Sequence, residues 1–197
     1  MKKLLSILLA FMMVISIVGC SSNEPSSTPS NTEPQSPVIE SAVDFYTEVW
    51  AAFGADNQFP ASGGDADNAA EGPAKFALSE ANADSFKHML KVTDELYDML
   101  DDDVATLQHM MNLNTFSSAV AKLKDPSKTS EFAEAYKTAI QGQRWMCGFP
   151  DKVVVISVGD YVVMAYGHEG NIDNLVAACS SVEEGSTVLV DDVAMIE

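Results

Sequence analysis

The sequence predicts an α+β domain built on an antiparallel sheet, and three observations support this class. Residues 153–158 and 161–166 are rich in β-branched and aromatic side chains, which favour extended backbone. The dipeptide Gly159-Asp160 separates them, and a two-residue loop of this kind is typical of a β-hairpin. Apolar residues recur at helical spacing in 127–141, and a second helix is expected over 171–182.

Strands at 115–123 and 187–190 complete the order β-α-β-β-α-β. This is the ferredoxin-like pattern, in which right-handed crossovers place both helices on one face of a four-stranded sheet. The hairpin strands carry no charged residue on either face, so both faces need a cover. We therefore expect additional N-terminal helices, carrying Trp50, Phe53 and Phe86, to cover the second face.

The single domain is expected to span residues 38–197, with a helical part at 38–112 and the ferredoxin-like part at 113–197. Helical periodicity at 38–53 predicts the first helix. The Gly-, Asp- and Asn-rich stretch that follows predicts a long surface loop over 54–73.

Two further helical segments are expected before the first strand. Residues 86–100 predict one helix, or two short ones divided near Val92 and Thr93. The acidic run Asp101–Asp103 is expected to cap another short helix that ends near Met111.

The first 19 residues have the pattern of an export signal. Lys2 and Lys3 precede an apolar run of about 15 residues, which is shorter than the roughly 20 residues that span a bilayer. The run ends in small Gly19, followed directly by Cys20. This pattern predicts a cleaved signal peptide.

Residues 17–20, Ile-Val-Gly-Cys, resemble the lipobox of bacterial lipoproteins, although Ile17 and Val18 depart from the ideal residues. The resemblance implies cleavage between Gly19 and Cys20, a diacylglycerol on the Cys20 thiol and a further acyl chain, such as palmitate, on its amine. Two or more chains anchor a protein stably in a lipid bilayer. The expected location is the cell membrane, facing outside the cytoplasm. The alternative is ordinary secretion with a free Cys20.

Residues 20–37 are polar and proline-rich, and they predict a disordered tether. The chain has a net charge of −18, and cleavage after residue 19 removes Lys2 and Lys3, which leaves 9 Lys and Arg against 29 Asp and Glu, or −20. Nucleic acid is not expected as a partner, because binding phosphate backbones requires clustered cations.

The stretch 145–150 is the candidate binding site, because it joins a helix to a strand and concentrates large apolar side chains beside Arg144. The candidate binding residues are Trp145, Met146, Cys147 and Phe149. The alternative is that Trp145 and Phe149 close one end of the core. We expect a non-catalytic module that binds an envelope protein or a small ligand at this stretch or at the loop 54–73. A purely structural envelope component is the other possibility.

No catalytic motif is present, and the sequence assigns no catalytic residue, cofactor or metal. The remaining enzyme hypothesis is a thiol enzyme in which His168 activates Cys147. His88-Met89 and His109-Met110-Met111 superficially suggest copper ligands. The alternative is that these methionines belong to the core, because the three histidines lie far apart in sequence and methionines at helical spacing are usually core residues. The acidic loop fails the EF-hand test, because Ala70 and Phe76 stand where Gly and Glu are required.

Cys147 and Cys179 are expected to remain unbonded. The predicted topology places them at opposite ends of a strand about 20 Å long, whereas a disulfide needs Cα atoms within about 7 Å. Cys179 is expected in the core, and Cys147 is expected to be a buried loop anchor.

Three segments resemble uncharacterised lipoproteins of Firmicutes that have a C-terminal βαββα domain of unknown function. They are residues 17–20, the stretch 143–150 (Gln-Arg-Trp-Met-Cys-Gly-Phe-Pro) and the hairpin 154–167. The resemblance implies a Gram-positive envelope location and this domain, and it implies no activity.

Overall fold

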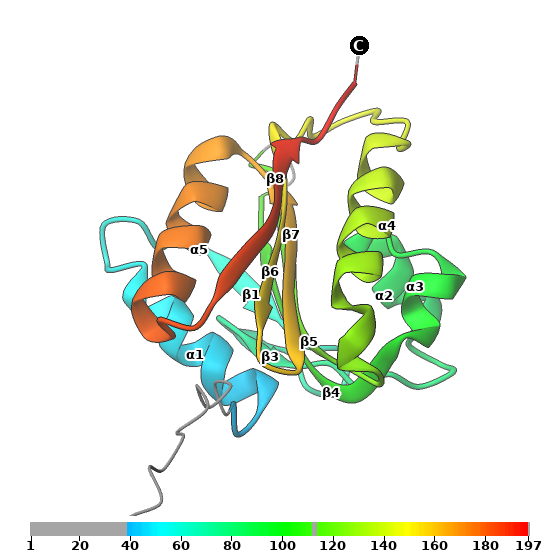
Figure 1. Ribbon diagram of the computed structural model, residues 1–197. Coiled ribbons are helices and arrows are strands. Elements are labelled where there is room, and N and C mark those ends of the chain that lie inside the picture. Colours follow the sequence, from blue (N-terminus) through cyan, green and yellow to red (C-terminus); the bar gives the residue numbers. More distant parts are fainter. Residues whose placement is uncertain (1–38, 112–113, 197) are drawn as a thin grey trace, which may run out of the picture. The chain divides into compact units, whose positions relative to one another are not determined.

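The computed structural model describes residues 39–111 and 114–196 (Figure 1). The predicted signal peptide, Cys20 and the tether lie outside the described residues. In chain order the elements are α1 (Ala42–Ala52), β1 (Ala61–Gly63), β2 (Ala70–Glu71), β3 (Ala74–Lys75), α2 (Ala83–Leu90), α3 (Asp94–Asp98), β4 (Leu100–His109), β5 (Phe116–Leu123), η1 (Pro126–Lys128), α4 (Thr129–Gln141), β6 (Lys152–Val158), β7 (Tyr161–Gly167), α5 (Glu169–Val182) and β8 (Thr187–Val193).

The described residues form one mixed α+β domain around an eight-stranded antiparallel sheet, so the predicted class is confirmed. Seven strands follow the order β2-β1-β4-β5-β7-β6-β8, and β3 also pairs with β4. The hairpin of β6 and β7 is confirmed, with Val158 opposite Tyr161. Its turn uses Gly159 at a φ of 57°, a left-handed conformation that glycine adopts without steric penalty.

The ferredoxin-like order is not confirmed, because β8 pairs with β6 instead of β5. The expected split βαβ pattern is present in one part of the sheet, where α4 connects β5 to β6 and β7 lies between these two strands. The position beside β5 belongs to β4, which makes the sheet larger than predicted.

The position of β8 also decides which face each helix covers. The crossovers from β5 to β6 and from β7 to β8 move in the same direction across the sheet, but β5 and β7 are antiparallel. Two right-handed crossovers of this kind place α4 and α5 on opposite faces. Figure 1 shows α4 with α2 and α3 on one side of the sheet, and α5 with α1 on the other. The expectation that α4 and α5 share a face is therefore wrong.

Both faces are covered, as the two-sided apolar strands require. Phe86 of α2 packs in the core on the α4 side, whereas Phe53, just after α1, packs on the α5 side. The N-terminal helices are therefore divided between the two faces and do not cover a single one.

The expected helix over 101–111 is wrong, because these residues form most of β4. Val104, Ala105, Thr106 and Leu107 are all buried, since successive strand residues point to opposite faces and both faces are covered. A short apolar run of this kind fits a helix or a strand equally well. Asp103 caps no helix within its own segment. Its carboxylate accepts hydrogen bonds from the Ala42 N–H of α1 and from the Tyr161 hydroxyl.

Residues 86–100 contain parts of two short helices. This confirms the predicted alternative of two helices divided near Val92 and Thr93. Helix α2 ends at Lys91, whose φ of 58° is left-handed and whose N–H donates to the Lys87 carbonyl. Thr93 caps α3 by accepting the Leu96 N–H at 3.3 Å. The predicted surface loop 54–73 contains the short strands β1 and β2.

Candidate functional site

The predicted binding stretch lines an open cavity of about 460 Å³, which we call the Trp145 cavity. Trp145, Met146 and Cys147 line it together with residues from α2, β4, β5 and β7. Phe149 is 53% exposed and is not among the lining residues. The structure therefore brings three of the four predicted residues together and places the fourth on the surface nearby.

The exposed fractions of these side chains indicate whether the stretch only closes one end of the core. Met146 is 84% exposed, and Trp145 is half-buried. The Trp145 ring packs on Tyr166 of β7, with ring centroids 5.1 Å apart. Because neither Trp145 nor Phe149 is fully buried, closing the core explains only part of the Trp145 contacts.

Two basic side chains, Lys91 and Arg144, line the Trp145 cavity, and no carboxylate lines it among the described residues. Lys91 is the only non-glycine residue with positive φ in the described chain. Such backbone is unfavourable for a side chain with a Cβ atom, and it recurs at functional sites. The Lys91 ammonium lies 6.0 Å from the centroid of the Trp145 ring.

Burial lowers the pKa of Lys91. The paired lysines behave differently: hydrogen bonds that their ammonium groups donate to carboxylates raise the pKa of Lys87 and Lys152. Lys91 therefore gives up hydration without gaining an anionic partner from the described residues.

Two buried polar atoms of the cavity residues have no hydrogen-bond partner within the described chain. They are the Thr115 hydroxyl oxygen and the Trp145 indole nitrogen, which can only donate. A third such atom, the Tyr136 hydroxyl, belongs to the core on the α4 side. A buried polar group without a partner is rare, and both of these atoms belong to residues that line the cavity.

His109 ends β4 and also lines the Trp145 cavity. Burial, and then the nearby His168, lower the pKa of His109. Its Nδ1 accepts the Met111 N–H at 3.0 Å, and its ring stacks on Phe59 with centroids 4.6 Å apart. Both His-Met pairs contribute residues to this cavity, yet the described residues contain no group of three or more His, Cys, Asp or Glu placed to hold a metal ion.

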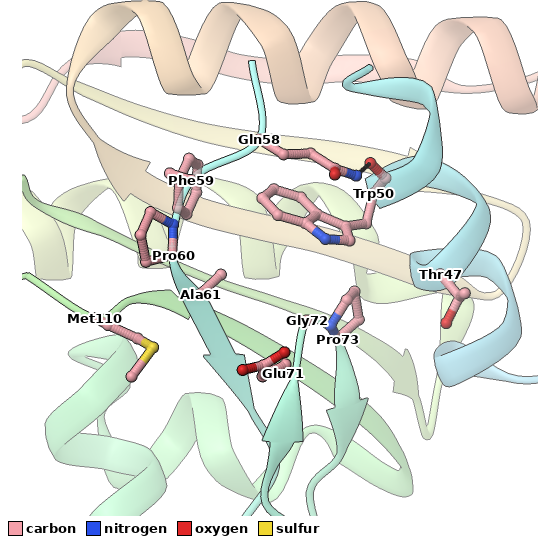
Figure 2. A pocket seen from close by; sticks show the side chains of 10 residues that line it. All are labelled: Thr47, Trp50, Gln58, Phe59, Pro60, Ala61, Glu71, Gly72, Pro73 and Met110. Carbon is pink, nitrogen blue, oxygen red and sulfur yellow. Dashed lines mark hydrogen bonds between the residues drawn. The ribbon is translucent and has the colours of Figure 1, made fainter. Parts of the chain in front are cut away.

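A second cavity, of about 420 Å³, surrounds Trp50, and we call it the Trp50 cavity. Figure 2 shows the Trp50 indole between Phe59 and the turn at Gly72 and Pro73. The Trp50 and Phe59 ring centroids are 5.0 Å apart. Glu71 is the only charged residue in the lining that the structure describes.

The thiol hypothesis receives mixed support from the geometry. Cys147 and Cys179 are both free thiols, and Cys147 is exposed, so the expectation of a buried loop anchor is wrong. Burial raises the pKa of Cys179 to about 12, as suits a core residue. His168 Nδ1 lies 3.1 Å from an Asp151 oxygen, and His168 is not among the described residues that line the cavity with Cys147.

The acidic loop has an internal role. The Asp65 carboxylate accepts hydrogen bonds from the Asp67, Asn68 and Ala77 N–H groups and from the Asn68 amide. Burial raises the pKa of Asp65, but these donors outweigh it and leave the pKa below its ordinary value. Its oxygens therefore hold the loop together.

Comparison with known proteins identifies no relative. No family model, curated protein or solved structure matches this chain. Across residues 39–111 and 114–196, every helix is too short or too polar to cross a membrane. Any functional conclusion therefore depends on the sequence signal and on the geometry of the two cavities.

Sequence reasoning identified Trp145, Met146 and Cys147 but missed Lys91 and Thr115. Neither residue belongs to a recognisable motif. Lys91 reaches the cavity because α2 ends there, and Thr115 precedes β5. The one local signal available in retrospect is the helix break near Val92 and Thr93, which places a lysine at a helix end.

Proposed function

We propose that this chain is an extracytoplasmic lipoprotein that binds a small ligand in the Trp145 cavity. Cys20 carries the acyl chains, residues 20–37 act as a tether, and the α+β domain supplies the binding site. The role is binding and not catalysis. The lipid bilayer is its partner through Cys20, and the ligand is its partner through the cavity.

The binding role rests on the side chains that line one cavity. Met146 and Cys147 are exposed there. Trp145 and Thr115 also line it, and each has a buried polar atom without a partner among the described residues. A volume of about 460 Å³ falls within the range of small-molecule sites. A purely structural component has no need of such a cavity.

The anchor is tested by labelling growing cells with a palmitate analogue. The full chain should take up the label and sediment with membranes, whereas Cys20→Ala should do neither, because two acyl chains are needed for stable anchoring. A Cys147→Ala variant is the matched control and should behave as the unaltered chain does. Equal labelling of the Cys20→Ala variant would contradict the lipid anchor.

Binding is tested on the mature chain with Cys20→Ala, which keeps it in solution. Small molecules are screened by the rise in melting temperature, because any ligand that binds only the folded state stabilises it. Ligands of the Trp145 cavity should lose their effect in Trp145→Ala and keep it in Trp50→Ala. A screen in which every hit depends on Trp50 would contradict the assigned site.

A further inference from the structure

The lining of the Trp145 cavity is electrically unusual for this chain. The sequence has 29 Asp and Glu against 11 Lys and Arg, so a surface cavity whose described lining has two cations and no carboxylate runs against the composition. Arg144 is exposed and Lys91 is half-buried, and neither takes part in an ion pair within the described residues. The cavity therefore attracts a negatively charged group.

The two cationic side chains favour a ligand that accepts hydrogen bonds. The Lys91 ammonium and the Arg144 guanidinium can only donate them. A carboxylate accepts several such bonds at once, and charge-assisted bonds of this kind are stronger than neutral ones.

The remaining lining favours a flat apolar body. Trp145 is half-buried, so part of its flat ring is open to a ligand, whereas Tyr166 and Phe116 line the cavity but are almost fully buried. Three methionines line it as well, and thioether side chains adapt to the shape of an apolar group. They are Met89, Met111 and Met146.

We propose that the ligand of the Trp145 cavity is an organic anion, a carboxylate carried on a flat apolar body. The carboxylate lies against Lys91 and Arg144, and the apolar body lies against the Trp145 ring and Met146. This assignment rests on the proposed binding function and adds the chemical class of the ligand.

Three probes of one shape test the charge. They are 2-naphthoate, neutral 2-naphthamide and the cation 2-naphthylmethylammonium, titrated calorimetrically into the mature chain with Cys20→Ala. Naphthoate should bind about tenfold or more tightly than naphthamide, since a charged hydrogen bond is worth that factor, and the cation should bind least. The Trp145 indole N–H resonance should shift on binding.

Matched variants locate the effect. Lys91→Met and Arg144→Gln should each reduce naphthoate affinity about tenfold and leave naphthamide affinity unchanged. Lys128→Met is the control, because Lys128 is exposed and does not line this cavity. Arg144 lies on an exposed segment, so its variant keeps the test valid if Lys91→Met fails to fold.

The outcomes separate the two proposals. If naphthamide or the ammonium probe binds at the Trp145 cavity as tightly as naphthoate, the anion assignment is wrong while the binding function stands. If none of the three probes shifts the Trp145 indole resonance, the anion assignment is wrong, and the melting-temperature screen decides the binding function.

Discussion

The Trp145 and Trp50 cavities are close in size, about 460 and 420 Å³, and each contains one of the two tryptophans of the chain. Their charges differ. Glu71 is the only charged residue described in the Trp50 cavity, whereas Lys91 and Arg144 line the Trp145 cavity without a carboxylate. In so acidic a chain the Trp50 cavity resembles the rest of the surface, and the Trp145 cavity is the exception. Size alone does not distinguish a binding site here, but charge does.

The hydrogen bonds of the two cavities differ in the same way. In the Trp50 cavity the Gln58 amide donates to the Trp50 carbonyl at 2.8 Å, and the Thr47 hydroxyl donates to the Val43 carbonyl at 2.7 Å. In the Trp145 cavity, the Trp145 indole nitrogen and the Thr115 hydroxyl have no partner among the described residues. Among the described residues, the Trp50 cavity lining therefore contributes no buried side-chain polar atom without a partner, whereas the Trp145 cavity lining contributes two.

The largest expected effect concerns the two thiols. Cys147 is exposed at the Trp145 cavity, and Cys179 is buried in the core on the α5 side. Cys147 should react with iodoacetamide at least about a thousandfold faster, because Cys179 becomes accessible only when the domain opens, at a free energy of several kcal/mol. Peptide mass spectrometry after timed alkylation measures both rates.

The same reaction separates the cavities. Naphthoate should slow alkylation of Cys147, and Trp50→Phe should leave this protection intact. Equal alkylation rates for Cys147 and Cys179 would overturn the placement of the two thiols.

Charge reversal in each cavity gives the next largest effect. Lys91→Glu should weaken naphthoate binding about a hundredfold, because it removes one charged hydrogen bond and adds a repulsive charge. Glu71→Lys makes the opposite change in the Trp50 cavity and should leave naphthoate affinity at the Trp145 cavity within about twofold, because salt screens exposed charges. Calorimetric titration measures both affinities. A larger effect from Glu71→Lys would show that the chemistry has been assigned to the wrong cavity.

The Trp145 ring gives a smaller effect. Trp145→Phe keeps an aromatic ring but removes part of the indole surface, so naphthoate affinity should fall about fivefold. Trp50→Phe should leave it unchanged. If Trp145→Phe binds naphthoate as the unaltered chain does, the Trp145 ring does not contact the ligand.

The smallest expected effect concerns a buried polar group of the core, away from the Trp145 cavity. The Tyr136 hydroxyl is buried and has no partner in residues 39–111 and 114–196, and burial, with a further contribution from Tyr166, raises the pKa of Tyr136. Tyr136→Phe removes an unsatisfied group and should increase the free energy of unfolding by about 1 kcal/mol, with naphthoate affinity unchanged. Urea denaturation measures the change. Destabilisation by more than about 1 kcal/mol would mean that the hydroxyl has a partner in solution.

The sequence predicted the hairpin, α4, α5 and the first helix, because each has a strong local pattern. It did not predict β4, since its apolar run at 104–107 fits either a helix or a strand. Local pattern is equally silent on whether β8 pairs with β5 or with β6, because both neighbours are apolar strands. That choice of neighbour decides which face α5 covers. The unpredicted pairing of β8 with β6 therefore places α5 on the face opposite to α4.

The site was half predictable for a related reason. Trp145, Met146 and Cys147 are adjacent in sequence, and a cluster of large side chains between two elements is visible without a structure. Lys91 and Thr115 join them only through the packing of α2 and β5 around β7. The basic character of the cavity comes partly from Lys91, so it is a property of the fold and not of any segment.

The most direct test is nuclear magnetic resonance of the two indole N–H groups during a naphthoate titration, with the mature chain carrying Cys20→Ala. Single-tryptophan variants assign the two resonances. The account predicts that the Trp145 resonance shifts progressively to saturation, that the Trp50 resonance stays within its line width, and that Lys91→Glu moves the midpoint of the shift to about a hundredfold higher naphthoate concentration. A shift of the Trp50 resonance with an unmoved Trp145 resonance would contradict it.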